Sequence, residues 1–198
     1  MTIRALVPAW AKSAIRNALW RFRARRVLAP VLASDTHSLL FICKGNVCRS
    51  PFAEALARQI APGDRAWIFG SAGTAPSRER VCPENAVAVA SAYGLDLRSH
   101  RAGPLDAYLA QSYDLLVVMD YEQYTLLCGR WPHLKPRIVL LSLFDAPAGT
   151  SARERLNITD PWGQDRDTFA ACYARVDRAV NEMLRQIAAR AGAADASG

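Results

Sequence analysis

Residues 39–51 read LLFICKGNVCRSP, and this stretch predicts a buried strand, a loop and the start of a helix. Leu39–Ile42 is a short continuous apolar run, which is typical of a strand buried on both faces. Pro51 suits the first turn of a helix, and the residues that follow it up to Arg58 have a helical pattern. In open parallel sheets, ligands bind beyond the carboxyl ends of the strands. The loop of residues 43–50 is therefore the predicted binding site.

The rest of the chain repeats this alternation of strand and helix patterns. Further apolar runs of strand length are Ala66–Phe69, Leu115–Met119 and Ile138–Leu141. Helical patterns cover residues 83–93, which Gly94 ends, residues 122–128, which Gly129 ends, and residues 167–189, where apolar residues recur every three or four positions. Strands that alternate with helices favour an α/β fold with a parallel sheet and helices on both faces.

The loop at residues 43–50 has the composition of an anion-binding nest. Gly45 and Asn46 are residue types that tolerate a positive φ, which a loop curled around an anion needs. The backbone N–H groups and the start of the helix would attract negative charge. Arg49 can align its planar guanidinium with two oxygens of a tetrahedral anion. Cys43, at the floor of the loop, would then be a thiolate in position to attack phosphorus in line.

A second motif, Asp160-Pro161-Trp162, precedes the long final helix. Pro161 biases Asp160 toward an extended conformation and stiffens the loop. A carboxylic acid held above the anion nest could protonate a departing ester oxygen and then activate water. Asp160 is thus the candidate general acid and base.

Taken together, these motifs resemble the low molecular weight protein tyrosine phosphatase family over roughly residues 38–190. The matching segments are Cys43–Pro51, Ser71–Thr74, Leu97–Ala102, Val118–Asp120 and Asp160–Gly163. The resemblance implies a three-layer fold whose four-stranded parallel sheet carries the phosphate-binding loop after its first strand. It also implies a two-step hydrolysis through a cysteinyl phosphate, with no metal and no cofactor.

The resemblance assigns a role to each candidate residue. Cys43 would be the nucleophile, Arg49 the phosphate clamp and Asp160 the general acid and then base. Asn46 would hold the loop geometry, and Ser50 would hydrogen-bond the thiolate and help to expel it in the second step. The remaining assigned residues are Lys44, Gly45 and Val47 of the phosphate-binding loop, Cys48, which in the family can pair with the nucleophile and shield it from oxidation, and Ser71 and His100, which buttress the loop.

Two residues depart from the usual family pattern. Lys44 stands at the pocket mouth where a smaller or apolar residue is common, and it would favour substrates with acidic groups nearby. Trp162 replaces the usual Tyr or Phe, and its indole can still stack on the phenol ring of phosphotyrosine. The Asp-Pro-aromatic-Gly form is similar to the bacterial branch, whose members often act on tyrosine kinases of surface-polysaccharide synthesis. The expected partner is therefore a protein that carries phosphotyrosine.

The positive charge of the chain lies in its first 26 residues. The chain has 25 Lys and Arg residues against 18 Asp and Glu, a net charge of +7, and the first 26 residues contain seven basic and no acidic side chains. We therefore divide the chain into a basic extension at 1–36, a phosphatase domain at 37–190 and a disordered tail at 191–198. The extension predicts a peripheral contact of residues 1–26 with an anionic membrane face, and no nucleic acid partner is expected. Five irregularly spaced cysteines and a poor signal-peptide pattern favour the cytoplasm.

Two other functions remain open at this level. One is a thioredoxin-coupled arsenate reductase of the same fold, which needs a pair of resolving cysteines after the third strand, where this chain has Cys128 alone. The other is a catalytically idle phosphate-binding or scaffold protein that works through its basic extension. Intact Cys43, Arg49 and Asp160 argue against the idle protein.

Overall fold

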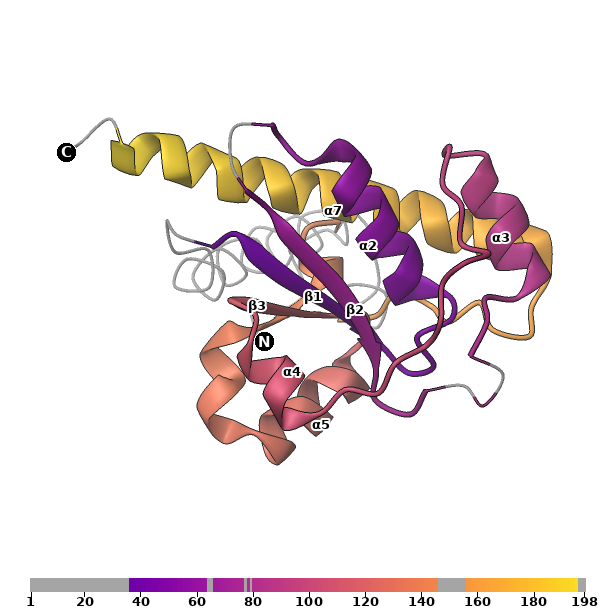
Figure 1. The fold of residues 1–198 in the computed structure, drawn as a ribbon, viewed down its shortest axis with the longest axis horizontal. Helices are drawn as coiled ribbons and strands as arrows, with labels where there is room; N and C mark the ends of the chain where they lie inside the picture. Colours follow the sequence, from indigo (N-terminus) through magenta and orange to yellow (C-terminus); the bar gives the residue numbers. More distant parts are fainter. Residues whose placement is uncertain (1–35, 64–65, 77, 79, 146–155, 196–198) are drawn as a thin grey trace, which may run out of the picture.

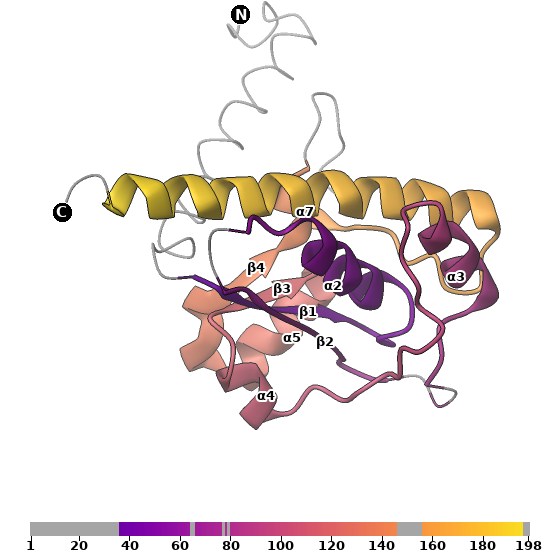
Figure 2. The same ribbon diagram turned by 45° about the horizontal axis from the view of Figure 1, so that its top comes forward.

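The computed structural model describes residues 36–63, 66–76, 78, 80–145 and 156–195. The basic extension predicted at 1–36 lies outside these residues, apart from Thr36. Four strands in the described part form one parallel sheet in the order β2-β1-β3-β4 (Figures 1 and 2). The strands are β1 (Ser38–Cys43), β2 (Ile68–Gly73), β3 (Leu115–Val118) and β4 (Ile138–Leu140). The predicted four-stranded parallel sheet is confirmed.

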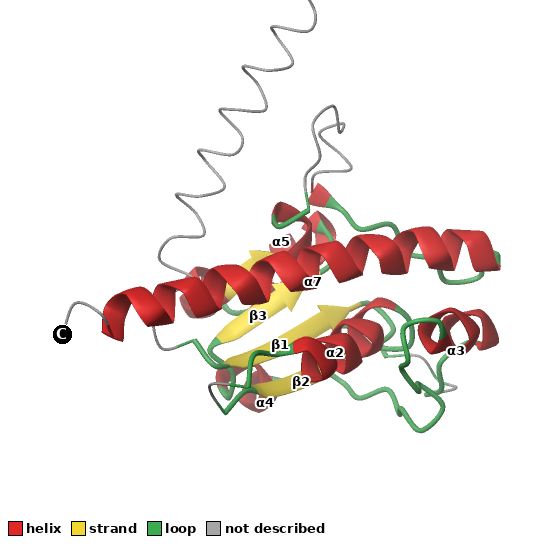
Figure 3. Cartoon of the chain, turned by 90° about the horizontal axis from the view of Figure 1, so that it is seen from above, coloured by secondary structure: helices red, strands yellow, loops and turns green. Residues whose placement is uncertain are grey.

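Helices cover both faces of this sheet, which gives the three layers that the sequence predicts (Figures 2 and 3). One face carries α2 (Arg49–Ile60), α3 (Glu84–Ser91) and α7 (Arg166–Asp195), and the other carries α4 (Ala107–Gln111), α5 (Tyr121–Arg130) and the 3-10 helix η2 (Pro132–Arg137). A further short 3-10 helix, η3 (Leu141–Leu143), follows β4.

Each strand divides its side chains between two buried layers. On β1, Leu39 and Phe41 pack toward α2 and α7, whereas Leu40 and Ile42 pack toward α5. All four side chains are fully buried, as the continuous apolar run predicts.

Several element boundaries differ from the predictions. Strand β2 begins at Ile68 and continues through the small residues of Gly70–Gly73, where no apolar run marks it. A Cβ atom at Gly70 would collide with the side chain of Tyr113, so the strand accepts a glycine in order to pack closely. Helix α5 continues past Gly129 to Arg130, and α4, η2 and η3 were not predicted.

The final helix is longer than predicted. We expected it to end near Ala189 and a disordered tail to begin at residue 191, but α7 continues to Asp195. Residues 191–195 include three alanines, the residue with the strongest helix propensity, which explains the extension. Residues 196–198 lie outside the described part. No described helix combines the length and the apolar character that crossing a membrane requires.

The chain order places a binding crevice at one edge of the sheet. Strand β1 is central, with β2 on one side and β3 on the other, so the connections leaving β1 and β3 diverge at their carboxyl ends. Such a switch point is where open α/β sheets bind ligands. The loop between β1 and α2 begins at this point.

Candidate active site

The loop from Cys43 to Ser50 curls around the sulfur of Cys43. Cys43 is the last residue of β1 and is buried. Ser50 Oγ donates a hydrogen bond to Cys43 Sγ at 3.0 Å, and the backbone N–H of Asn46 donates a second at 3.2 Å. The first residue of the predicted loop is therefore held as a nucleophile would be.

Asn46 is the centre of the loop geometry. Its φ is +52°, in the left-handed region that Asn tolerates better than most residues, whereas Gly45, which we also expected to need a positive φ, does not adopt one. Asn46 Nδ2 donates to both Ser50 Oγ and Ser71 Oγ at 2.9 Å. Asn46 Oδ1 accepts the backbone N–H of Gly103 at 2.9 Å. One buried side chain thus ties the loop to β2 and to the segment before α4.

The other predicted supporting residue also contacts Asn46. His100 Nε2 lies 2.8 Å from the backbone oxygen of Asn46, so the imidazole holds the main chain at the turn of the loop. The backbone N–H groups of Thr74 and Ala75 donate to the carbonyls of Cys43 and Lys44 at 3.0 and 2.9 Å. The segment after β2 therefore forms a second support, which the sequence did not reveal.

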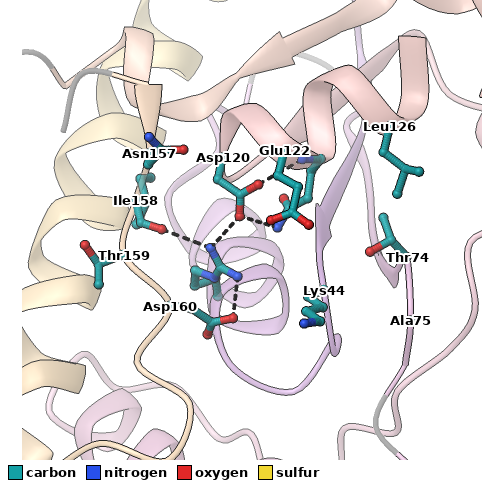
Figure 4. A pocket seen from close by; sticks show the side chains of 12 residues that line it. Lys44, Thr74, Ala75, Asp120, Glu122, Leu126, Asn157, Ile158, Thr159 and Asp160 are labelled. Carbon is teal, nitrogen blue, oxygen red and sulfur yellow. Dashed lines mark hydrogen bonds and ion pairs between the residues drawn. The ribbon is translucent and has the colours of Figure 1, made fainter. Parts of the chain in front are cut away.

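Arg49 lies under the site between two carboxylates. Its side chain is only 2% exposed. Nη1 donates to Asp120 Oδ2 at 3.0 Å and to the carbonyl oxygen of Ile158 at 2.9 Å, and Nη2 donates to Asp160 Oδ2 at 2.6 Å (Figure 4). Burial lowers the pKa of Arg49, but the negative charges of Cys43, Asp160 and Asp120 outweigh burial and raise it overall. The guanidinium stays charged, and its Nε has no hydrogen-bond partner among the described residues.

Two adjoining cavities open above this cluster. The first, of about 420 Å³, is lined by Cys43, Asp160 and Trp162 together with Lys44, Gly45, Val47, Cys48 and Ala75. The second, of about 580 Å³, contains Arg49 and extends beneath α5 (Figure 4). Asp160 lines both cavities, and the indole of Trp162 is 64% exposed at the edge of the first. The predicted nucleophile, general acid and pocket residues thus line the first cavity, whereas the guanidinium of Arg49 lies at the second.

Comparison with known proteins identifies the chain. A sequence model of the family described as low molecular weight phosphotyrosine protein phosphatase matches residues 38–192.

The chain belongs to this family.

Individual relatives agree with this assignment. Wzb from Salmonella typhi, a low molecular weight protein-tyrosine-phosphatase, is 32% identical over 156 residues, which are 79% of this chain and 97% of the relative. The crystal structure of the Erwinia amylovora tyrosine phosphatase AmsI has a TM-score of 0.66 at 28% identity and covers 76% of this chain and 92% of its own. Wzb from Escherichia coli K30, solved with sulphate, has a TM-score of 0.66 at 29% identity and covers 76% and 97%. The chain is thus a protein-tyrosine-phosphatase.

The site of this phosphatase includes residues to which the sequence reasoning assigned no role. Asp120 caps α5 by accepting the N–H of Gln123 at 2.9 Å, and it also accepts from Gln123 Nε2 and Arg49. Tyr173 of α7 donates from its hydroxyl to the carbonyl of Cys48 at 3.1 Å. Asp120 lies two residues after the buried parallel strand β3, at the edge of the sheet that carries the loop, and that position was the available signal.

The remaining thiols of the phosphatase differ from Cys43 in their surroundings. All five cysteines are free in this structure, including Cys43 and Cys48. Burial raises the pKa of Cys48 well above its ordinary value, with the negative charge of Asp160 as a second cause. Burial likewise raises the pKa values of Cys82 and Cys172 to about 12. These three are neutral thiols at physiological pH.

Proposed function

We propose that this phosphatase hydrolyses phosphotyrosine on a bacterial protein through a cysteinyl-phosphate intermediate. The observation that carries the proposal is the first cavity, in which the hydrogen-bonded sulfur of Cys43 and the carboxylate of Asp160 face the same space. A phosphate group that enters this cavity meets the nucleophile at one end and the proton donor on the wall. The sulphate complex of the Escherichia coli K30 relative supports anion binding by the family.

In the first step, the Cys43 thiolate attacks phosphorus and the bond from phosphorus to the phenol oxygen breaks. Asp160, in its acid form, gives its proton to the departing phenolate. Arg49 Nη2 already donates a hydrogen bond to Asp160, and Arg49 Nε has no hydrogen-bond partner among the described residues. We infer that the phosphate takes over the Nη2–Nε edge of the guanidinium and releases Asp160 toward the leaving oxygen.

In the second step, water attacks the phosphocysteine. Asp160, now a carboxylate, takes a proton from the water, and the bond between sulfur and phosphorus breaks to return the thiolate. Ser50 Oγ, 3.0 Å from the sulfur, stabilises the departing thiolate. Asn46 keeps Ser50 aimed at the sulfur through its 2.9 Å hydrogen bond. Inorganic phosphate then leaves the cavity.

The aromatic wall supports aryl phosphates as the substrates. Trp162 offers an exposed indole face beside the cavity, on which the ring of a phosphotyrosine can stack. The similarity to bacterial protein-tyrosine-phosphatases supports a phosphotyrosine substrate. From the Asp-Pro-aromatic-Gly form of the sequence, we propose a tyrosine kinase of surface-polysaccharide synthesis as the phosphoprotein.

The test has a catalytic and a trapping part. Reduced full-length protein should hydrolyse p-nitrophenyl phosphate near pH 6, and Cys43→Ser should abolish turnover. Absence of turnover in the unaltered protein would favour the idle scaffold. Asp160→Ala should retain the phosphoprotein in a pull-down. The identity of the retained protein then shows whether the substrate is such a tyrosine kinase. Thioredoxin-coupled arsenate reduction that disappears in Cys128→Ala would instead establish the reductase.

We also propose that the enzyme works at the cytoplasmic face of an anionic membrane. The support is the sequence of the first 26 residues, in which seven basic side chains are interleaved with Trp10, Trp20 and Phe22. Basic residues beside an anionic surface each contribute about 1 kcal/mol of attraction.

A further inference from the structure

The second cavity adjoins the catalytic one. The two share Lys44, Ala75 and Asp160 in their walls, and the second extends from this boundary to Glu122 and Leu126 of α5 (Figure 4). A polypeptide advances about 3.3–3.6 Å per residue when extended. A substrate whose phosphotyrosine fills the first cavity therefore brings a neighbouring residue to the mouth of the second.

The carboxylates that line the second cavity are not equivalent. Asp160 is bonded to Arg49 until a phosphate displaces it and then serves as the protonated acid, and Asp120 is bonded to Arg49 and Gln123, so neither offers an uncompensated charge to a flanking residue. The side chain of Glu122 is exposed and makes no hydrogen bond or ion pair with a described residue. Glu122 is therefore the carboxylate of this cavity that remains available to a substrate.

The rest of the cavity wall suits an aliphatic stem. Leu126, one turn of α5 after Glu122, is 49% exposed, and Thr74 and Ala75 lie across the space from it (Figure 4). Lys44 stands at the boundary with the catalytic cavity and repels a cation there. Asp120 offsets the charge of Arg49 in the same wall, so a cationic group is favoured at the far end, beside Glu122 and away from Lys44, with its methylene groups against Leu126.

We propose that the second cavity is a substrate subsite that receives a basic side chain, Arg or Lys, flanking the phosphotyrosine. Glu122 binds its charge and Leu126 its stem. The proposal rests on the proposed function, since the flanking residue is defined by a phosphotyrosine in the first cavity. Glu122 is then a specificity-determining residue and not a catalytic one.

The test compares pairs of phosphotyrosine peptides that differ only in Arg against citrulline, a neutral isostere, at each position flanking the phosphotyrosine. At one or more positions, the ratio of kcat/KM for the Arg peptide to that for the citrulline peptide should be about three- to fivefold at low salt. The preference should appear in KM, because the contact is made equally in the ground state and the transition state. It should decrease with added salt.

Substitutions at Glu122 and at a control position test whether Glu122 causes the preference for the Arg peptide. Glu122→Gln should bring the ratio to about one, and Glu122→Lys should bring it below one. Glu84→Gln, which removes an exposed acid of α3 outside these cavities, should leave the ratio as it is. Each rate is divided by the same variant's kcat/KM on p-nitrophenyl phosphate, so a general loss of activity cancels.

The outcomes separate the two proposals. Hydrolysis of both peptides at equal rates at every position, or a ratio that survives Glu122→Gln, would overturn the subsite and leave the phosphatase function standing. If neither the peptides nor p-nitrophenyl phosphate is hydrolysed, the proposed function itself fails.

Discussion

Arg49 Nη2 lies 2.6 Å from Asp160 Oδ2, which joins the candidate phosphate clamp directly to the candidate general acid. The side chain of Asp160 is 40% exposed and that of Arg49 is 2% exposed. A carboxylate near the surface therefore pairs with a buried cation. A phosphate dianion must compete with that carboxylate for the guanidinium. Binding of substrate and release of the acid are therefore coupled in this site.

We predict that Asp160→Ala binds inorganic phosphate several-fold more tightly while kcat falls by about 10²–10⁴-fold on substrates with poor leaving groups. The substitution removes both a competitor for Arg49 and a negative charge beside the anion. Competitive inhibition by phosphate measures the affinity, and a series of aryl phosphates measures the dependence on the leaving group. Unchanged or weaker phosphate binding would contradict the coupling, and an unaltered rate with a poor leaving group would refute the acid role.

We predict that Asp120→Asn lowers kcat/KM by about tenfold or more, a loss of roughly 1.4 kcal/mol in transition-state stabilisation. Asparagine keeps an oxygen that can cap α5, but it removes the negative charge that fixes Arg49 Nη1. Asp106→Asn is the matched control, because Asp106 caps α4 in the same way, accepting the N–H of Leu109 at 2.8 Å, and has no arginine partner among the described residues. Equal losses of rate in the two variants would argue against a specific role of Asp120.

We predict different effects of Asn46→Gly and Asn46→Ala on stability but similar effects on rate. Both remove the amide that holds Ser50, Ser71 and Gly103, so both should lower kcat on p-nitrophenyl phosphate by an order of magnitude or more. Alanine also has to adopt the φ of +52°, which costs about 1–2 kcal/mol that glycine avoids. Thermal unfolding and steady-state kinetics check the two parts, and a glycine variant with full activity would show that the amide contacts are dispensable.

The candidate site shows what the sequence could predict and what it could not. The loop from Cys43 to Ser50 is contiguous, so its residue types and its place after an apolar run were enough to predict it. The carboxylate partners of Arg49 come from 71 and 111 positions away. Asp120 reaches the site only because β3 pairs with β1, with Val118 opposite Ile42, and no local pattern states that pairing.

The difference between local patterns and tertiary contacts also explains which strand boundaries were predicted wrongly. Apolar runs predicted β1, β3 and β4 to within one residue at either end. Strand β2 was placed too early because its second half, Gly70–Gly73, is built of small residues that fit against Tyr113. That requirement is a tertiary contact and leaves no hydrophobic period in the sequence.

We predict that the first 26 residues bind the protein to vesicles that contain anionic lipid. The full-length chain should co-sediment with phosphatidylglycerol vesicles and not with phosphatidylcholine vesicles, and added salt should weaken the binding. Replacing Arg21, Arg23, Arg25 and Arg26 with glutamine should reduce binding by at least about tenfold, because each basic residue contributes about 1 kcal/mol. Equal co-sedimentation of the two proteins would rule out the electrostatic contact.

We predict that iodoacetamide at pH 7 labels Cys43 before Cys82 and Cys172. The pKa values of Cys82 and Cys172 are raised to about 12, chiefly by burial, so only about 10⁻⁵ of each thiol is ionised at pH 7. Because a raised pKa keeps the unreactive thiol form to higher pH, their labelling should increase about tenfold per pH unit up to pH 12 in the folded protein. Cys43 instead lines the catalytic cavity, where its sulfur accepts hydrogen bonds from Ser50 and Asn46. Mass spectrometry of the labelled peptides gives each rate, and inorganic phosphate should protect Cys43 but not Cys82 or Cys172, since it occupies the cavity above the sulfur of Cys43. Labelling of Cys82 as fast as Cys43 at pH 7, or of Cys43 at the same rate with and without phosphate, would place the reactive thiol elsewhere.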